Sequence, residues 1–189
     1  MFHRAAVAAC VTAALVCAAT VPLTAEGETA FTFTVANAPK TGLAEDRLPV
    51  TIHRWSSDSE RDRIATLLAA NDTASLAYTL KNADAIGHLR WPGGLDYTLR
   101  YARQTPRADG GADILLVAES RVWVWWDSSR DIGLDEPFTV IHVRLDKSGT
   151  GQGWIAAASD VRSDKTSGVA LAGVQGRPAL ITDIRPQRG

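Results

Sequence analysis

The sequence predicts an α+β fold that is mostly antiparallel β, with a short helical pair inserted after the second strand. Strand-length segments with alternating apolar residues recur along the chain, and Gly or Pro marks nearly every turn between them. A capping-box pattern at Ser57-Asp58-Ser59-Glu60 marks the start of a helix. An apolar leader precedes the domain. The alternation of apolar residues does not decide whether these strands close as a barrel or fold as a sandwich.

The first 25 residues have the three-part order of a secretory signal peptide. Arg4 provides the positive charge, an apolar run follows from Ala5 to about Val21, and Ala25 offers a small side chain before the cut. We expect cleavage after Ala25, with Ala19 as the alternative. The run is Ala-rich and shorter than the roughly 20 apolar residues of a spanning helix, which disfavours an uncleaved anchor. We therefore expect a secreted or periplasmic protein with no stable membrane span after cleavage.

Cleavage after Ala25 changes the composition of the mature chain. Both cysteines, Cys10 and Cys17, lie in the leader, so no disulfide or cysteine-based metal site is expected. A lipid anchor on Cys17 is disfavoured because Val16 stands where a small residue is needed. The leader holds one of the 20 basic residues and none of the 21 acidic residues, which leaves a formal charge of −2. This balance argues against nucleic-acid and anionic-membrane partners, which require a concentrated positive field.

The mature chain is expected to begin with two strands joined by a loop. Phe31–Val35 alternates aromatic or aliphatic residues with Thr, and Leu48–Trp55 alternates again. Pro49, which donates no backbone hydrogen bond, suggests that the second strand is an edge. The polar stretch 37–46 contains Pro and Gly and is expected to be a flexible loop.

Residues 57–82 are expected to form the helical insertion. After the capping box, Ile64, Leu67 and Leu68 share one helical face. Leu76 and Leu80 are one helical turn apart and indicate a second short helix from about Thr73 to Asn82.

From Ile86 onward the chain is expected to be a meander that completes one β-rich domain, residues 26–189. The expected strands are Ile86–Trp91, Tyr97–Thr105, Asp113–Glu119, Arg121–Trp126, Phe138–Asp146, Gly153–Arg162, Val169–Val174 and Ala179–Ile184. Turn-forming residues separate these strands. The polar C-terminal segment, Arg185–Gly189, is expected to be frayed.

A set of short motifs runs through the mature chain. They are Arg54-Trp55, Glu60-Arg61-Asp62, Arg100-Tyr101-Ala102-Arg103-Gln104-Thr105-Pro106, Asp109-Gly110-Gly111, Glu136-Pro137-Phe138-Thr139 and Arg144-Leu145-Asp146. In these motifs the chain resembles a family of uncharacterised secreted bacterial proteins. The resemblance implies export and the domain boundaries but no activity, because the motifs have no assigned chemistry. The family pattern has Asp-x-Asp-Gly in the later hairpin, whereas this chain has Asp146-Lys147-Ser148-Gly149, which weakens a calcium interpretation.

The mature chain has three histidines, and each lies in an expected strand with an arginine one or two residues later. They are His53, His88 and His142. The chain lacks an H-x-H pair and the H-E-x-x-H motif, and the neighbouring arginines would repel a cation, so we expect no metal site. The segment after Asp146 has one carboxylate and is followed by an expected strand, which favours a glycine-rich hairpin over a calcium or phosphate loop. We therefore expect no cofactor.

Catalytic signatures are sparse. The sequence has no Gly-x-Ser-x-Gly elbow, and no cysteine remains after cleavage. Asp160, Asp164 and Asp183 flank late strands and could act as paired carboxylates, but acidic residues that cap turns are far commoner. An enzyme of this kind would need a histidine within hydrogen-bond reach of Asp or Glu in a cleft.

The tryptophans are the least ordinary feature of the composition. All six belong to the mature chain, and three of them lie in Arg121–Trp126, where both strand faces are apolar. Such a strand is either central and covered on both sides or part of an aromatic-lined pocket. The candidate ligand-binding residues are Trp123, Trp125, Tyr101, Arg103, His142 and Arg144.

Three functional hypotheses follow from these features. The first is a non-enzymatic binding module for a small apolar or amphipathic ligand. The second is an extracytoplasmic hydrolase that uses histidine and carboxylate groups. The third is an envelope interaction or structural protein that acts through an exposed sheet edge and the segment 37–46. The sequence does not indicate an oligomeric state.

Overall fold

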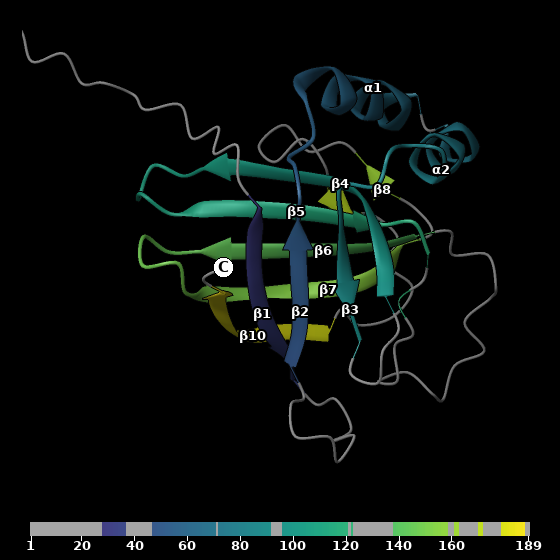
Figure 1. Cartoon of the computed structure of the whole chain (residues 1–189). Coiled ribbons are helices and arrows are strands. Elements are labelled where there is room, and N and C mark those ends of the chain that lie inside the picture. The colour runs from purple at the N-terminus through teal and green to yellow at the C-terminus, as the bar shows by residue number, and fades with distance from the viewer. Residues whose placement is uncertain are drawn as a thin grey trace, which may run out of the picture.

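The computed structural model describes residues 28–36, 47–70, 72–91, 96–120, 122, 138–158, 161–162, 170–171 and 179–187. Within them, eight antiparallel strands form a closed barrel, and two helices lie on its outer surface (Figure 1). The strands follow chain order around the wall, from β1 to β7 and then β10, which pairs with β1. The expected antiparallel architecture is confirmed, and the meander closes as a barrel rather than a sandwich.

Most element boundaries agree with the sequence expectations to within a few residues. The elements are β1 (Thr29–Val35), β2 (Arg47–Ile52), α1 (Asp58–Ala69), α2 (Thr73–Lys81), β3 (Gly87–Arg90), β4 (Asp96–Pro106), β5 (Ala112–Ala118), β6 (Phe138–Leu145), β7 (Gly151–Ala158), β8 (Val161–Arg162), β9 (Ala170–Leu171) and β10 (Ala179–Gln187). The exception is the expected strand Gly153–Arg162, whose described residues fall in two strands, β7 of the barrel and β8, which pairs with β9 in a separate two-stranded sheet. The helical pair follows the second strand, as expected. The expected signal peptide, the loop 37–46 and all of the segment Arg121–Trp126 except Val122 lie outside the described residues.

Barrel closure corrects two expectations about strand ends. The second strand is not an edge, because β2 pairs with both β1 and β3. Its ladder with β3 covers only Val50 to Ile52, so Pro49 need not donate to that neighbour. The segment Arg185–Gln187 is not frayed either, because it pairs with Ala30–Thr32 of β1 and completes the closure.

The barrel interior is filled by apolar side chains from every strand of the wall. Along β6, Ile141 and Val143 point inward and are fully buried, which confirms the core face expected for this segment. The interior cluster comprises Phe31, Phe33, Val35, Leu48, Val50, Ile52, Ile86, Leu89, Leu99, Ala102, Ile114, Leu116, Ala118, Val122, Ile141, Val143, Ile155, Ala179, Ile181 and Ile184. An eight-stranded barrel is narrow enough for side chains of this size to fill it.

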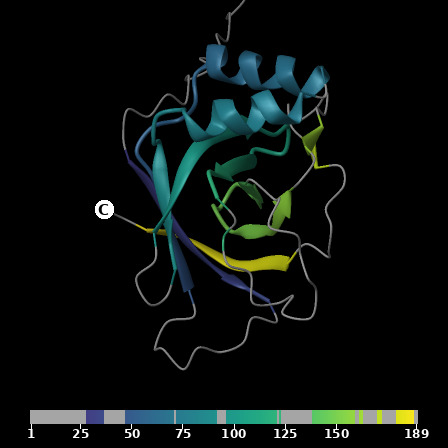
Figure 2. The ribbon, with the colours of Figure 1, turned by 90° about the vertical axis from the view of Figure 1, so that its right-hand side faces the viewer.

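A second apolar cluster lies outside the barrel, beneath the helices. Figure 2 shows α1 and α2 lying across one side of the wall. Ile64, Leu76 and Leu80 from the helices pack against outward side chains of β4 to β6. Those strand residues are Tyr101, Leu115, Val117, Phe138 and Val140. Neither helix combines the length and apolar character needed to cross a membrane, within the part of the chain that the structure describes.

Candidate functional site

The strand registers align outward side chains in rows across β4, β5, β6, β7 and β10. Residues directly opposite each other in an antiparallel pair project from the same face of the sheet. One row consists of Arg103, Leu115, His142, Trp154 and Leu180. The neighbouring row, closer to the hairpins, consists of Thr105, Asp113, Arg144 and Gln152. These rows bring together residues that are up to about 80 positions apart in sequence.

Asp113, His142 and Arg144 form a polar cluster where the two rows meet. Arg144 Nε donates to Asp113 Oδ1 at 3.2 Å, and His142 Nε2 lies 3.6 Å from the same oxygen. Burial lowers the pKa of His142 and the Arg144 charge lowers it further, whereas the Asp113 charge acts in the opposite direction. His142 is 19% exposed, so its neutral form is favoured.

Arg144 keeps unused hydrogen-bonding capacity. Its side chain is 58% exposed, and only its Nε atom donates to Asp113. The described residues supply no acceptor for its two terminal amino groups. A guanidinium in this state can bind a carboxylate or phosphate through two parallel hydrogen bonds.

An aromatic and aliphatic surface continues from this cluster. The rings of His142 and Trp154 have centroids 5.4 Å apart and planes tilted by 35°. Trp154 is partly buried against the cluster beneath the helices, and Leu180 on the next strand is 49% exposed. We call Arg144, His142, Trp154 and Leu180 the outer strip. Its chemistry changes from cationic to apolar across three neighbouring strands.

A surface depression of about 500 Å³ adjoins the polar end of the outer strip. It lies along the β4–β5 hairpin, and its charged side chains form two ion pairs. Arg107 contacts Asp109 at 2.6 Å, and Arg144 contacts Asp113 at 3.2 Å. The depression is lined by Thr105, Pro106, Arg107, Ala108, Asp109, Asp113 and Arg144. Because its two arginines are paired with its two aspartates, the depression is polar and carries no net formal charge.

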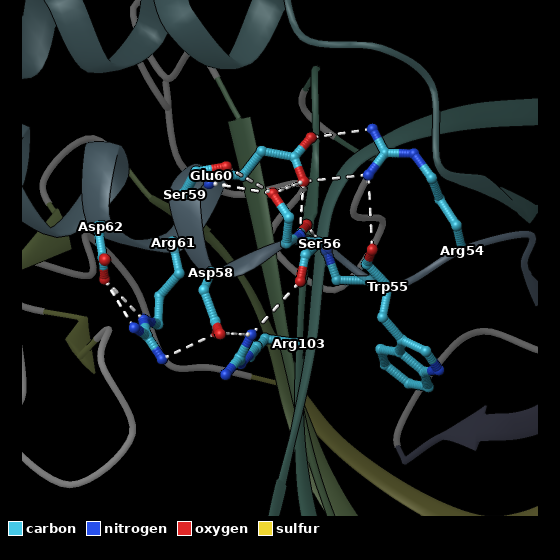
Figure 3. A network of polar contacts seen from close by, with 11 residues as sticks. Arg54, Trp55, Ser56, Asp58, Ser59, Glu60, Arg61, Asp62 and Arg103 are labelled. Atoms are coloured by element: carbon cyan, nitrogen blue, oxygen red, sulfur yellow. Dashed lines mark hydrogen bonds and ion pairs between the residues drawn. The ribbon is translucent and has the colours of Figure 1, made fainter. Parts of the chain in front are cut away.

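The structure gives Arg103, a predicted site residue, a different role. Its Nη1 atom contacts Asp58 Oδ1 at 2.9 Å and donates to the Ser56 carbonyl at 3.4 Å (Figure 3). Ser56 is buried and bonds to β4 by two hydrogen bonds, its N–H to the Ala102 carbonyl and its Oγ from the Ala102 N–H. Arg103 therefore holds the start of α1 against β4 and does not extend the outer strip.

The capping box at the start of α1 is confirmed and carries an added ion pair. Ser57 Oγ accepts from the Glu60 N–H at 3.2 Å, while the Glu60 carboxylate accepts from the Ser57 N–H at 2.6 Å. Arg54 donates to both carboxylate oxygens, at 2.9 and 3.0 Å (Figure 3). Hydrogen bonding from Arg54 is the largest cause, and together with the bonds from Ser57 it lowers the pKa of Glu60 to about 2. The network fixes the helical pair to the wall.

Tyr101, another predicted site residue, does not belong to the outer strip. Tyr101 is 2% exposed beneath the helices, and its burial raises its pKa. A register shift between Leu99 and Tyr101 allows Leu99 and Ala102, which are three residues apart, both to face the interior, while Tyr101 faces outward. Trp123 and Trp125 lie outside the described residues. Of the four predicted residues that the structure describes, His142 and Arg144 are therefore the two brought together.

The remaining histidines lie on another part of the wall. His53 Nδ1 is 3.0 Å from Glu28 Oε2, and the His53 and His88 rings have centroids 5.5 Å apart. Within the described ranges, no group of three or more His, Cys, Asp or Glu side chains is arranged to hold a metal ion. The arginines that follow these histidines are neutralised, because Arg54 pairs with Glu60 and Arg90 with Asp96.

Two of the acidic residues considered from sequence occupy turns or bulges. Asp146 accepts from the Ser148 and Thr150 hydroxyls and N–H groups, which lowers its pKa to about 2. Gly149 follows with φ of 80°, as a tight hairpin requires. Asp183, at a bulge in β10, bonds to Arg47 and Arg185. Asp160 and Asp164 lie outside the described residues.

Sequence reasoning missed Asp113 and Leu180 as site residues. Asp113 was recognised only as the start of a strand, although strict alternation places it on the face opposite Ile114. Leu180 has a comparable signal, because its neighbours Ala179 and Ile181 occupy the interior face. Alternation alone could not show that Asp113 lies opposite Arg144, or that Leu180 lies opposite Trp154.

Comparisons with known proteins give no match: no family model, no curated protein and no solved structure is similar to the chain.

Proposed function

We propose that this protein is an exported, non-enzymatic binding module that holds a small amphipathic molecule with an acidic group on its outer strip. The signal-like leader supports export. The motifs at Arg100–Pro106 and Arg144–Asp146 support membership of the secreted bacterial family that the chain resembles.

The observation that carries the proposal is the continuity of the outer strip. The exposed guanidinium of Arg144 lies beside the stacked rings of His142 and Trp154, and half-exposed Leu180 follows on the next strand. Because β6, β7 and β10 are consecutive neighbours, the strip extends about 10 Å across the sheet. A ligand of that length can place its acidic group on Arg144 and its apolar body on Trp154 and Leu180.

The local chemistry supports an acidic rather than a basic ligand group. Asp113 is already bonded to Arg144, while the two terminal amino groups of Arg144 point to no acceptor among the described residues. Half-buried His142 provides a neutral ring rather than a second charge. Aromatic and aliphatic surface around a single charged anchor is typical of small-molecule sites.

The hydrolase alternative has two histidine–carboxylate contacts to consider. His53 Nδ1 lies 3.0 Å from Glu28 Oε2, but both side chains are more than half exposed, so this pair lies on open surface rather than in a cleft. The other contact is between His142 and Asp113. Their closest atoms are 3.6 Å apart, slightly beyond hydrogen-bond distance. Within the described part of the chain, no hydroxyl group bonds to His142 as a nucleophile would. The binding hypothesis therefore accounts for more of the observed contacts.

The envelope-interaction alternative keeps part of its first support, an exposed sheet edge. Each of the eight barrel strands has a neighbour on both sides, but some ladders are short: β10 pairs with β7 only at Ala179–Ile181, and β4 pairs with β3 only at Asp96–Leu99. Its second support, the segment 37–46, lies outside the described residues.

The binding proposal is tested by native mass spectrometry of the protein from its own host, followed by titration with alkyl and aryl carboxylates. We expect Arg144→Gln to weaken carboxylate binding about tenfold, since a charge-assisted contact is lost. Arg90→Gln is the matched control. Arg90 is 56% exposed and pairs with the opposite residue Asp96, but it lies outside the outer strip.

Equal carboxylate affinity in Arg144→Gln, Arg90→Gln and the unaltered protein would contradict a ligand site at Arg144. Absence of any retained molecule, together with absence of carboxylate binding, would contradict the binding function. Intact mass reports export independently, because cleavage after Ala25 gives a chain that begins at Glu26.

A further inference from the structure

We propose that His53 and His88 form a two-imidazole site for a divalent transition-metal ion of the class Zn²⁺, Ni²⁺ or Cu²⁺. The site lies on the outer surface of β2 and β3, which are neighbours in the wall (Figure 1). It is separate from the outer strip on β6, β7 and β10, so it does not depend on the proposed binding function.

Strand pairing brings the two histidines to one face. His88 in β3 lies directly opposite Thr51 in β2, and His53 follows Thr51 by two residues. The His53 N–H donates to the Ile86 carbonyl at 2.8 Å, which continues the pairing beyond the end of β2. Residues in this diagonal relation project from the same side of the sheet, within reach of each other's side chains.

The separation of the two rings suits shared coordination. Their centroids are 5.5 Å apart and their planes are tilted by 46°. Metal–nitrogen bonds of about 2 Å at a tetrahedral angle place two coordinating imidazole centroids about 5 Å apart. Small side-chain rotations are therefore enough to direct one nitrogen of each ring at a common ion.

Glu28 determines which nitrogen of His53 is available. Its Oε2 atom lies 3.0 Å from His53 Nδ1, and a carboxylate only accepts hydrogen bonds. Nδ1 therefore carries the proton, and the lone pair is on Nε2. A carboxylate behind a histidine fixes the tautomer and raises the basicity of the ligating nitrogen in many metal sites.

The local charge does not oppose a cation. The arginines nearest to these histidines in sequence are neutralised by bidentate contacts, Arg54 with Glu60 and Arg90 with Asp96. Glu28 adds a negative charge. With two protein ligands, water completes the coordination, and imidazole favours Zn²⁺, Ni²⁺ and Cu²⁺ over Mg²⁺ or Ca²⁺.

The test is titration of the untagged protein with Ni²⁺, Zn²⁺ and Mg²⁺ by calorimetry. We expect one Ni²⁺ or Zn²⁺ per chain and no Mg²⁺ binding. His53→Gln and His88→Gln should each weaken binding at least tenfold, and Glu28→Gln about tenfold. His142→Gln is the matched control, because His142 is the third histidine of the domain and lies on the outer strip.

Nuclear magnetic resonance provides a second readout that does not depend on folding differences between variants. Cu²⁺ should broaden the ring signals of His53 and His88 before that of His142. Unchanged affinity in His53→Gln or His88→Gln would overturn the site. An equal loss in His142→Gln, or simultaneous broadening of all three rings, would also overturn it. Carboxylate binding to the outer strip is measured separately, so failure of either proposal leaves the other distinguishable.

Discussion

The wall formed by β4, β5 and β6 differs from the wall formed by β1, β2 and β3 in the number of buried faces. In β5, every residue from Ile114 to Ala118 is buried, since the barrel interior covers one face and the helices cover the other. In β2, buried and half-buried residues alternate. The difference arises outside the strands themselves, because α1 and α2 lie over one wall.

The contrast between the wall covered by helices and the uncovered wall also determines where the two candidate sites lie. The outer strip begins where helical cover ends, since Trp154 packs partly against the second cluster and Leu180 is half-exposed. The His53 and His88 pair lies on the wall that faces solvent, where half-buried polar residues replace apolar ones. Both candidate sites use outward positions of the barrel wall, because the described interior positions are filled by apolar side chains.

The largest expected effect on stability distinguishes the barrel interior from the apolar cluster beneath the helices. Leu116→Ala should lower the free energy of unfolding by about 3 to 4 kcal/mol, because the hydrogen-bonded wall cannot collapse into the cavity. Leu115→Ala should cost about 2 to 3 kcal/mol, because the helices can shift towards the gap. Leu180→Ala, at a half-exposed position, should change stability by less than about 0.5 kcal/mol. Urea unfolding measures all three, and a greater loss in Leu115→Ala than in Leu116→Ala would reverse this ranking.

A smaller effect concerns the attachment of the helices to the wall. The folded pKa of Glu60 is about 2, below its ordinary value of 4.5, so its stabilisation is present above about pH 4.5. As the pH falls from there towards 2, stability should decrease by about 1 kcal/mol after discounting for solvent screening at this partly exposed pair. Glu60→Gln should be less stable at pH 7 and lose less on acidification. Parallel pH profiles for the variant and the unaltered protein would exclude this contribution.

The smallest effect concerns His142 at the edge of the helical cover. Burial lowers its folded pKa below the unfolded value of 6.5, so the unfolded chain binds a proton more readily. Stability is therefore greatest above about pH 6.5 and decreases as the pH falls below it. Thermal unfolding between pH 7.5 and 5.5 should show a smaller decrease in Tm for His142→Asn. An equal decrease in Tm for His142→Asn and the unaltered protein would exclude a burial effect at His142.

Much of the fold was predictable because it depends on local patterns. The capping box at Ser57 marked the start of α1, and alternation along β6 placed His142 and Arg144 opposite the core face. The apolar run of β5 was the available signal for a strand covered on both sides, although the prediction assigned that role to Arg121–Trp126. The chemistry of the candidate sites was less predictable. Tyr101 and Arg103 proved to serve packing and helix attachment.

Local patterns in the chain were enough to predict the strand and helix periods, the turns and the outward or inward direction of strand residues away from the bulges in β4 and β10. These properties follow from backbone geometry over a few residues. Long-range contacts set the rest: β10 closes on β1, the helices cover β4 to β6, and Arg144 lies near Trp154 and His53 near His88. Those contacts depend on register between distant strands, which is set by the packing of the whole barrel.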